Sequence, residues 1–222
     1  MTKEIKDIRT KRVKKLNEVL KKMYPSPKVA LNYRTEWELL VAVILSAQCT
    51  DVRVNLVTKK LFVQFPDIES YAQATQHTME KAVFQCGFYR NKAKHIRESA
   101  QIILSDFAGE VPHTMDELLM LPGVARKTAN VILSNAFGVH EGIAVDTHVR
   151  RFAIRFDLTD FADPKRIEKD LMEIMPISEW WGFNHRLVHY GRDVCPARKH
   201  DCTQHPLTLV YPEAKNMWPK AH

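Results

Sequence analysis

The sequence predicts an all-α fold, and three observations support this prediction. Apolar residues recur at the three- and four-residue spacing of amphipathic helices along most of the chain. No stretch shows the sustained alternation of apolar and polar residues that is typical of a half-buried strand. Glycine accounts for only 7 of 222 residues, which disfavours a turn-rich β-sandwich.

Residues 1–22 form the first predicted helix. They hold nine Lys and Arg residues against three Asp and Glu residues, so most of the chain's formal net charge of +7 lies here. One helical stripe runs from Ile5 to Leu20 and includes Arg9 and Arg12. We therefore expect a helix that docks through this stripe and turns a basic face to solvent, ended by the Tyr-Pro-Ser-Pro segment behind it.

Three helices are predicted in the next part of the chain. Residues 35–38 read Thr-Glu-Trp-Glu, which is a capping-box pattern, and the apolar run 39–45 behind it predicts a fully buried helix. Residues 53–64 and 91–105 place their apolar residues on one side and predict amphipathic helices.

Clear start and stop signals mark three further helices. Residues 114–117 form a second capping box, and they open a short helix that ends at Pro122-Gly123. The next helix is expected from Lys127 to a C-cap at Gly138. Residues 163–175 begin with an Asp-Pro pair, which supplies an N-cap and a proline at the first helical position.

Composition limits the class of protein. Charged residues make up 27% and apolar residues 45%, as in a globular rather than a disordered chain. The longest apolar run is far shorter than the roughly 20 residues that cross a bilayer, and the N-terminus lacks a secretory signal. We expect a cytoplasmic monomer without a membrane partner, whose cysteines are reduced thiols. The positive net charge makes nucleic acid a reasonable partner.

Residues 121–129 read Leu-Pro-Gly-Val-Ala-Arg-Lys-Thr-Ala and predict a helix, a tight turn and a second helix. The start of a helix binds phosphate through N–H groups that lack intrahelical partners and through the helix dipole. Gly123 would let the backbone approach a phosphate closely, because glycine has no Cβ. An ordinary helix connection with solvated Arg126 and Lys127 is the alternative, and this segment by itself leaves both open.

A second chemical signal is Asp146, within residues 143–151. It follows an apolar tripeptide and precedes a predicted helix, which is the pattern of a simple N-cap. A carboxylate near a lysine can instead stabilise a developing cation and assist proton transfer. Both interpretations stay open at this point.

Together these two segments resemble the helix-hairpin-helix DNA glycosylases of the endonuclease III type. Three other segments of the chain, residues 45–52, 87–93 and 191–199, also match that family in the expected order. The resemblance covers roughly residues 10–202, most of the chain. The joint order of five segments is far more specific than any single motif.

The resemblance implies a two-domain all-α fold with the DNA cleft between the domains. A six-helix domain of residues 29–138 would carry the hairpin. Residues 1–28 and 139–222 would form a discontinuous second domain.

The resemblance also implies an activity: base-excision repair by a bifunctional DNA glycosylase and AP lyase, acting on oxidised pyrimidines in duplex DNA. Lys127 would be the nucleophile that attacks the sugar of a flipped nucleotide and forms a Schiff base, and Asp146 would assist. Two alternatives are a mismatch-type thymine or uracil glycosylase and a non-catalytic helix-hairpin-helix DNA-binding module.

The DNA contacts follow from the same comparison. Gln48 resembles the residue that fills the gap left by the extruded base, although a buried structural glutamine is the alternative. His148 and Arg150 are candidate phosphate contacts, with a plain solvated face as the alternative. The full expected set is Gln48, Leu121, Pro122, Gly123, Val124, Ala125, Arg126, Thr128, His148 and Arg150. Ala125 departs from the glycine that the family usually has there.

The C-terminus departs further from the family pattern. Relatives usually carry four cysteines, spaced x6, x2 and x5, that hold a [4Fe–4S] cluster. Here Cys195 and Cys202 keep the first spacing, but His205 and Tyr211 occupy the third and fourth positions. Because two thiolates cannot supply the four ligands of a cluster, we expect no cluster and no other cofactor.

Two accounts of this segment remain. Cys195, His200, Cys202 and His205 could bind zinc, although the single residue between His200 and Cys202 makes tetrahedral closure difficult. Alternatively, apolar packing replaces the cluster. The residues expected to pack are Leu207, Leu209, Val210, Tyr211, Met217 and Trp218.

Overall fold

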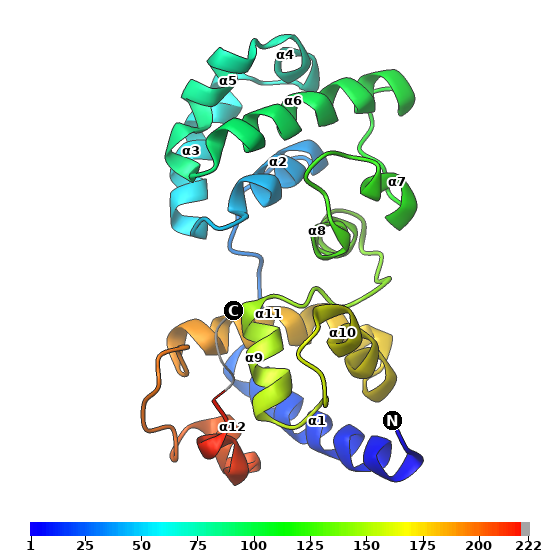
Figure 1. Cartoon of the computed structure of the whole chain (residues 1–222), viewed down its shortest axis with the longest axis vertical. Coiled ribbons are helices and arrows are strands. Elements are labelled where there is room, and N and C mark those ends of the chain that lie inside the picture. The colour runs from blue at the N-terminus through cyan, green and yellow to red at the C-terminus, as the bar shows by residue number, and fades with distance from the viewer. Residues whose placement is uncertain (219–222) are drawn as a thin grey trace. The chain divides into compact units, whose positions relative to one another are not determined.

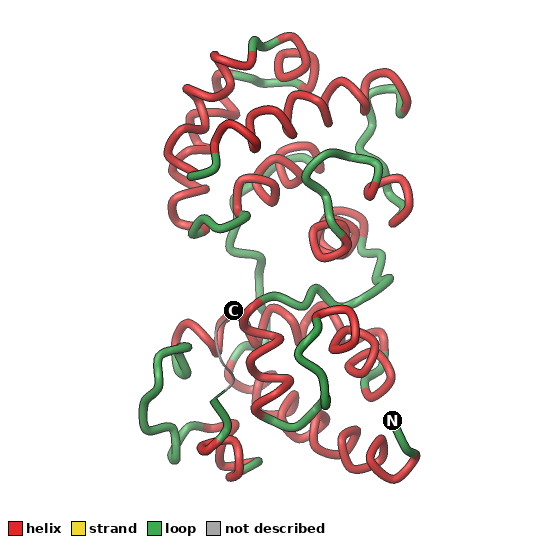
Figure 2. Tube along the Cα trace, in the orientation of Figure 1, coloured by secondary structure: helices red, strands yellow, loops and turns green. Residues whose placement is uncertain are grey.

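The computed structural model describes residues 1–218, and within them every regular element is helical (Figure 2). No helix of these residues is long and apolar enough to cross a membrane. The chain divides into two compact units. We call Val29–Glu141 the hairpin unit, and Met1–Lys28 together with the chain from Gly142 onward the terminal unit.

The hairpin unit is built around one buried helix, α2 (Figure 1). Residues 39–45 of α2 are all buried, as their uninterrupted apolar run predicts. Helices α3, α6 and α8 pack against α2, and α4 and α5 pack against α6. The helices are α2 (Glu36–Ser46), α3 (Asp51–Gln64), α4 (Ile68–Gln73), α5 (Gln76–Val83), α6 (Tyr89–Asp106), α7 (Met115–Leu119) and α8 (Arg126–Ile132), with the 3₁₀ turn η1 (Phe84–Cys86) and the π-helical segment η2 (Leu133–Phe137).

Of the two predicted capping boxes, the threonine N-caps are confirmed, but the return bond from Glu38 is not formed. Thr35 and Thr114 are N-caps whose hydroxyls accept hydrogen bonds from the N–H groups of Glu38 and Glu117. The Glu38 carboxylate does not complete the box as expected, because it accepts from the N–H of Arg34 at 2.7 Å and pairs with the Arg34 guanidinium. The ion pair with Arg34 gives this carboxylate a stronger partner than the Thr35 amide.

The helix expected from Lys127 to Gly138 is regular for its first half only. After Ile132 it widens into the π-helical segment η2 and ends at Gly138, which has the predicted left-handed C-cap conformation. The Ser134 hydroxyl donates to Asn130 O at 2.6 Å, and the Asn135 amide donates to Val131 O at 2.8 Å. Side-chain donors that reach carbonyls of the preceding turn favour such irregularities, and the apolar periodicity gave no sign of them.

The terminal unit has its own core. Helix α1 packs against α10, α11 and α12, and α9 packs against α11. Large side chains such as Leu16, Phe152, Phe183 and Tyr190 are buried between them. The helices are α1 (Lys3–Met23), α9 (Thr147–Arg155), α10 (Pro164–Ile174), α11 (Ile177–Asp193) and α12 (Pro206–Val210), with the 3₁₀ turn η3 (Pro212–Asn216).

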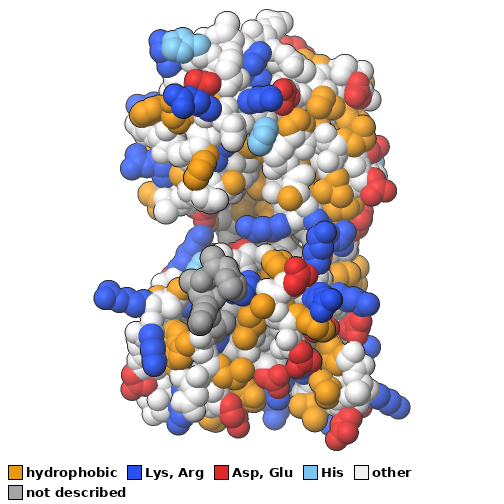
Figure 3. Space-filling view, in the orientation of Figure 1, with side chains coloured by type: hydrophobic (Ala, Val, Ile, Leu, Met, Phe, Trp, Pro, Cys, Tyr) orange, Lys and Arg blue, Asp and Glu red, His pale blue; other side chains and the backbone are white. Residues whose placement is uncertain are grey.

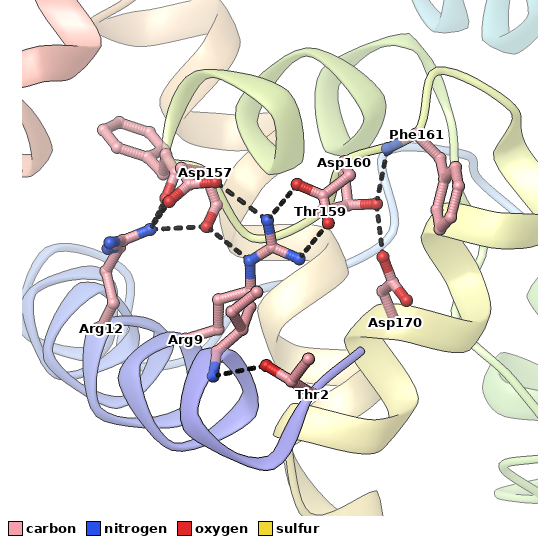
Figure 4. Close-up of polar contacts among 10 residues, drawn as sticks. Thr2, Arg9, Arg12, Asp157, Thr159, Asp160, Phe161 and Asp170 are labelled. Atoms are coloured by element: carbon pink, nitrogen blue, oxygen red, sulfur yellow. Dashed lines mark hydrogen bonds and ion pairs between the residues drawn. The ribbon is translucent and has the colours of Figure 1, made fainter.

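Helix α1 docks, but its buried stripe differs from the predicted one. Ile5 and Ile8 are 39% and 50% exposed, whereas the Arg9 side chain is 3% exposed. The guanidinium of Arg9 donates to the carboxylates of Asp157 and Asp160 at 3.0 and 2.7 Å (Figure 4). The predicted stripe is therefore wrong at Ile5 and Ile8 and confirmed at Arg9, whose partners are an acidic turn far along the sequence that helical periodicity does not reveal.

Arg9 and Arg12 consequently contribute little to a basic surface. The Arg12 guanidinium donates to the Asp157 carboxylate at 2.6 Å, and it lies 4.2 Å from the ring centre of Tyr211. Over the terminal unit, Figure 3 shows Lys and Arg side chains interspersed with acidic ones on the visible face. The local charge count of residues 1–22 thus overstates the charge that this segment presents to a polyanion.

Replacing Arg9 by Met should lower the free energy of unfolding by about 1–2 kcal/mol, because it removes charge-assisted hydrogen bonds from a buried position. The value is moderate because the Asp160 side chain is 65% exposed and can be hydrated in the variant. Urea titrations at neutral pH measure the loss. Lys15→Met, at an exposed position of the same helix, is the control and should be nearly neutral.

The Arg9 effect should depend on pH in one direction. The hydrogen bond from Arg9 holds the pKa of Asp160 below its ordinary value of 3.8. A carboxylate whose pKa is depressed in the folded state stabilises the fold at pH values above its unfolded-state pKa. This contribution is lost as the pH falls through the folded-state pKa. The difference between wild type and Arg9→Met should therefore shrink below about pH 4. A difference that grows in acid would contradict the ion-pair explanation.

Candidate nucleic-acid interface

The hairpin turn of residues 120–125 is anchored from inside the hairpin unit. Leu121 and Val124 are buried in the core, and the N–H of Val124 donates to Leu121 O at 3.1 Å. The Ser99 hydroxyl of α6 donates to Pro122 O at 3.3 Å. Because their side chains point into the core, Leu121 and Val124 can offer only backbone atoms to a ligand.

Glycine is required at position 123 because of its backbone conformation and because the side chain of His95 packs against it. The φ of Gly123 is +80°, a conformation that L side chains rarely adopt, and a Cβ there would lie 2.7 Å from the Nδ1 of His95. The sequence suggested that the missing Cβ leaves room for a phosphate. In the structure that room is taken by His95 of α6, so Gly123 is needed for packing as well as for the turn.

Helix α8 begins without a side-chain cap. Its N-cap is Ala125, and within residues 1–218 no side chain accepts a capping hydrogen bond there. Thr50, Thr75 and Asp67 do cap the helices that follow them. The methyl group of Ala125 accepts no hydrogen bond, so this helix start lacks a side-chain acceptor, and such a helix start favours an anion.

Lys127 lies in the first turn of α8, and its side chain is exposed. Arg126 and Thr128, on either side, are half-buried. An exposed primary amine thus stands beside a helix start that favours anions.

The Gln48 loop connects α2 to α3. Gln48 has φ +52° and is exposed, so the alternative of a buried structural glutamine is wrong. The loop rests on the buried ammonium of Lys92, which donates to Leu45 O at 2.9 Å and to Cys86 O at 2.6 Å. Burial lowers the pKa of Lys92. Burial also raises the pKa of the neighbouring Cys86 to about 12, so Cys86 stays a thiol at neutral pH.

Asp146 belongs to the terminal unit and is the N-cap of α9. Its Oδ1 accepts from the N–H groups of His148 and Val149 at 2.9 and 2.8 Å, which confirms the N-cap interpretation. Burial, with a smaller effect of His189, lowers the pKa of His185 to about 4, so that ring is neutral at pH 7. The Asp146 carboxylate in turn raises the pKa of His185 and of Arg151, which partly opposes the larger effect of burial on both groups.

His148 and Arg150 are held within the terminal unit. A Cβ on Gly191 of α11 would lie 2.2 Å from His148 Nδ1, so this glycine lets α11 approach α9. The Arg150 guanidinium donates to Ala162 O at 2.9 Å. Both residues are half-buried, and their contact with phosphate stays a prediction.

The C-terminal ligand candidates separate into two groups. Donor atoms of Cys195, His200 and His205 lie within 4.8 Å of one another, whereas Cys202 is outside this group. The guanidinium of Arg155 donates to Cys202 Sγ at 3.0 Å and to Cys195 Sγ at 2.9 Å. Of the apolar residues expected to pack here, Leu207 is buried but Leu209 is 61% exposed, so the predicted patch is only partly formed.

Sequence reasoning missed three residues that hold these segments. Lys92 lies in the segment 87–93, whose resemblance to the family was the available signal, but its partners are distant in sequence. His95 and Arg155 carry no signal of their own. Their roles come from packing against Gly123 and from contact with the two buried sulfurs.

Comparison with known proteins agrees with this geometry. The family model "HhH-GPD superfamily base excision DNA repair protein" matches residues 41–176. Endonuclease III of Synechocystis sp. is 49% identical over 89% of this chain and 90% of that protein. Endonuclease III of Bacillus subtilis is 43% identical over 87% of this chain and 88% of that protein.

Solved structures give the same picture. A trapped endonuclease III–DNA covalent intermediate has a TM-score of 0.87 at 41% identity, over 93% of this chain and 97% of that one. A thermostable thymine-DNA glycosylase reaches a TM-score of 0.78 at 21% identity, over 93% and 98% of the two chains. At that identity the second match is evidence for the fold only.

Replacing Lys92 by Met should loosen the Gln48 loop, because Leu45 O and Cys86 O lose their buried donor. We expect the free energy of unfolding to fall by about 1–3 kcal/mol. The amides of Ala47 and Cys49, which bond to Ile44 O and Ser46 O, should also exchange hydrogen faster. Lys94→Met is the matched control, since Lys94 is an exposed lysine of the same helix. Unchanged exchange at these two amides in Lys92→Met would show that the loop does not depend on Lys92.

Proposed function

Because this chain belongs to the HhH-GPD superfamily of base excision DNA repair proteins, we propose that it is a DNA glycosylase with AP lyase activity. Its substrate is duplex DNA that contains damaged bases or abasic sites. The observation that carries the proposal is the exposed Lys127 in the first turn of α8, beside helix N–H groups that have no side-chain cap.

The reaction requires a neutral amine and a flipped nucleotide. A base inside the duplex shields its glycosidic carbon, so the target nucleotide is extruded first. The Nζ of Lys127 attacks C1′, the C1′–N bond breaks, and the base leaves with the bonding electron pair and takes up a proton. The resulting amine intermediate opens the sugar to a Schiff base between Nζ and C1′. Loss of a C2′ proton then expels the 3′ phosphate by β-elimination.

Asp146 is proposed as the assisting carboxylate. Its Oδ1 is engaged by two N–H groups of α9, which fixes the orientation of the side chain. Oδ2 takes no part in these two bonds. In our proposal it stabilises the positive charge that develops on the sugar and accepts protons during Schiff-base formation.

The hairpin is proposed to hold the DNA backbone. The N–H groups around Gly123 and at the start of α8 bind a phosphate, helped by the helix dipole. Arg126 and Thr128 would add side-chain contacts. Gln48, on its exposed left-handed turn, would fill the space that the extruded base leaves.

We propose oxidised pyrimidines as the preferred damage. The alternative is a mismatch-type thymine or uracil glycosylase, but the thymine-DNA glycosylase match lies at 21% identity and supports only the fold. A lysine at position 127 favours an enzyme that forms a Schiff base over one that only releases the base. For the same reason a non-catalytic DNA-binding module is the weakest candidate.

The residues present do not fit a [4Fe–4S] cluster. Two of the four expected positions carry His205 and Tyr211, and Arg155 donates to Cys195 Sγ at 2.9 Å and to Cys202 Sγ at 3.0 Å. Cys195 and Cys202 therefore supply only two of the four thiolates that such a cluster requires. We propose that the enzyme works without this cluster, as a monomer, in the compartment that holds the chromosome, which is the cytoplasm in a bacterium.

Borohydride trapping on duplex DNA with a thymine glycol tests the proposed chemistry. Borohydride reduces the Schiff base to a stable amine, so wild-type protein should give a covalent adduct. Lys127→Ala should lower trapping by at least about 10³-fold, because it removes the nucleophile. Lys94→Ala, which removes another exposed lysine of the hairpin unit, should trap like wild type.

Other outcomes identify the alternatives. Release of the thymine glycol without any adduct would support a monofunctional enzyme, and activity confined to G·T or G·U mismatches would support the mismatch class. DNA binding with neither product would leave the DNA-binding module. Trapping that persists in Lys127→Ala would show that another amine is the nucleophile.

A further inference from the structure

The segment between α11 and α12 gathers three metal-ligand side chains. Cys195 is fully buried, and His200 and His205 are half-buried. One donor atom from each lies within 4.8 Å of the other two. The rings of His200 and His205 have centroids 5.0 Å apart, and the edge of Trp218 covers His200. These side chains come from a stretch of 11 residues, so their meeting is a property of this one loop.

Both imidazoles keep a buried nitrogen without a partner. Nδ1 of His200 lies 2.6 Å from Arg198 O, and only a protonated Nδ1 can donate to that carbonyl. The lone pair of His200 is therefore on Nε2, which is buried and has no hydrogen-bond partner among the described residues. Nδ1 of His205 is likewise buried and has no hydrogen-bond partner among the described residues. Buried polar atoms are normally satisfied, and a backbone carbonyl that fixes the tautomer of a histidine is typical of metal ligands.

Cys202 lies outside this group of three, and Arg155 contacts both cysteines. The Arg155 guanidinium is fully buried, lies 4.1 Å from the ring centre of Trp218, and donates to Ala214 O at 3.0 Å. It also donates to Cys202 Sγ and to Cys195 Sγ.

The separation of Cys202 corrects the ligand set that the sequence suggested. With four ligands, the single residue between His200 and Cys202 made tetrahedral closure difficult. Without Cys202 the spacing is Cys195-x4-His200-x4-His205, and no two ligands are closer than five positions along the chain. The exposed carboxylate of Asp201 interacts electrostatically with both histidines and offsets part of the charge of a bound cation.

We propose that Cys195, His200 and His205 bind a single divalent transition-metal ion, with Zn²⁺ as the fitting ion. One thiolate and two neutral imidazoles are ligands that Zn²⁺ prefers, and three protein ligands leave its fourth tetrahedral position to water. Binding forms one metal–sulfur bond and two metal–nitrogen bonds and releases the proton of the Cys195 thiol. The ion would fasten the 195–205 loop beside Arg155, independently of the proposed repair activity.

The test uses untagged full-length protein, stripped of metal and kept under reducing conditions. Titration with Zn²⁺ followed by calorimetry should give one ion per chain and a rise in melting temperature, because a ligand that binds only the folded state stabilises it. Co²⁺ in place of Zn²⁺ should show a thiolate-to-metal charge-transfer absorption.

Variants separate the three-ligand site from the other possibilities. Cys195→Ser, His200→Gln and His205→Gln should each weaken Zn²⁺ binding by at least about 100-fold. Cys202→Ser is the matched control, since it removes the neighbouring sulfur from the same loop and should bind Zn²⁺ within a few-fold of wild type. Circular dichroism of each metal-free variant shows that it is folded, and His200→Gln, at a half-buried position, keeps the test valid if Cys195→Ser unfolds.

Three results would overturn the proposal. Wild-type protein that binds no Zn²⁺ would show that Cys195, His200 and His205 do not form a metal site. Equal losses in Cys202→Ser and Cys195→Ser would show that both sulfurs are ligands. Stoichiometric iron with cluster-type absorption after reconstitution with iron and sulfide would show that the family's cluster forms here after all.

Discussion

The N–H groups at the start of a helix must find acceptors, and this constraint organises both units of the protein. Most helix starts here are closed by a Thr or Asp side chain from the N-cap position. Two of the starts concern the proposed chemistry. Helix α9 is capped by Asp146, so the N–H groups of His148 and Val149 hold the carboxylate in place. The N-cap of helix α8 is Ala125, which offers no side-chain acceptor. The same physical rule thus gives a fixed carboxylate in one unit and, in our proposal, a phosphate-binding helix start in the other.

Buried Arg and Lys side chains are the second feature that stabilises both units. Arg9 is satisfied by carboxylates, Lys92 by two backbone carbonyls, and Arg155 by two sulfurs, a carbonyl and an aromatic face. In each case the cation joins segments far apart in the sequence, because a long side chain can reach several acceptors that no local hydrogen bond satisfies. These positive charges support the fold. The formal net charge of +7 is therefore a poor measure of what the surface offers to DNA.

Arg155 and two histidines surround the sulfurs of the C-terminal loop. Only Cys195 and Cys202 match the four-cysteine pattern that the resemblance implies. A guanidinium joins these two sulfurs, and His200 and His205 bring unpaired nitrogens close to Cys195. In our proposals the enzyme works without the cluster, and these nitrogens bind a metal ion together with Cys195.

Much of the secondary structure was readable from the sequence because the signals are local. Caps at Thr35, Thr114 and Asp163, the apolar run of α2 and the C-cap at Gly138 all act within a few residues, and each lies where the sequence places it. The errors have a different origin. The π-helical segment η2 arises from side-chain bonds to carbonyls of the preceding turn, which apolar periodicity does not register. In α1 the predicted stripe was wrong at Ile5 and Ile8, which are exposed, because periodicity does not show where the partner surface of a helix ends. Arg9 belonged to that stripe and is buried, but its partners Asp157 and Asp160 could not be read from it.

The sequence by itself determined the helical class, the family and the two segments that carry Lys127 and Asp146, since order and spacing along the chain are enough for these. Tertiary structure decided what surrounds them. Only the fold shows that Gly123 is packed against His95 and that Gln48 is exposed on a loop supported by Lys92. Only the fold also shows that Cys195 lies close to both histidines and that Cys202 is outside this group. The reason is physical: helix signals act over one turn, whereas burial, hydrogen-bond partners and ligand geometry depend on atoms that only folding brings together.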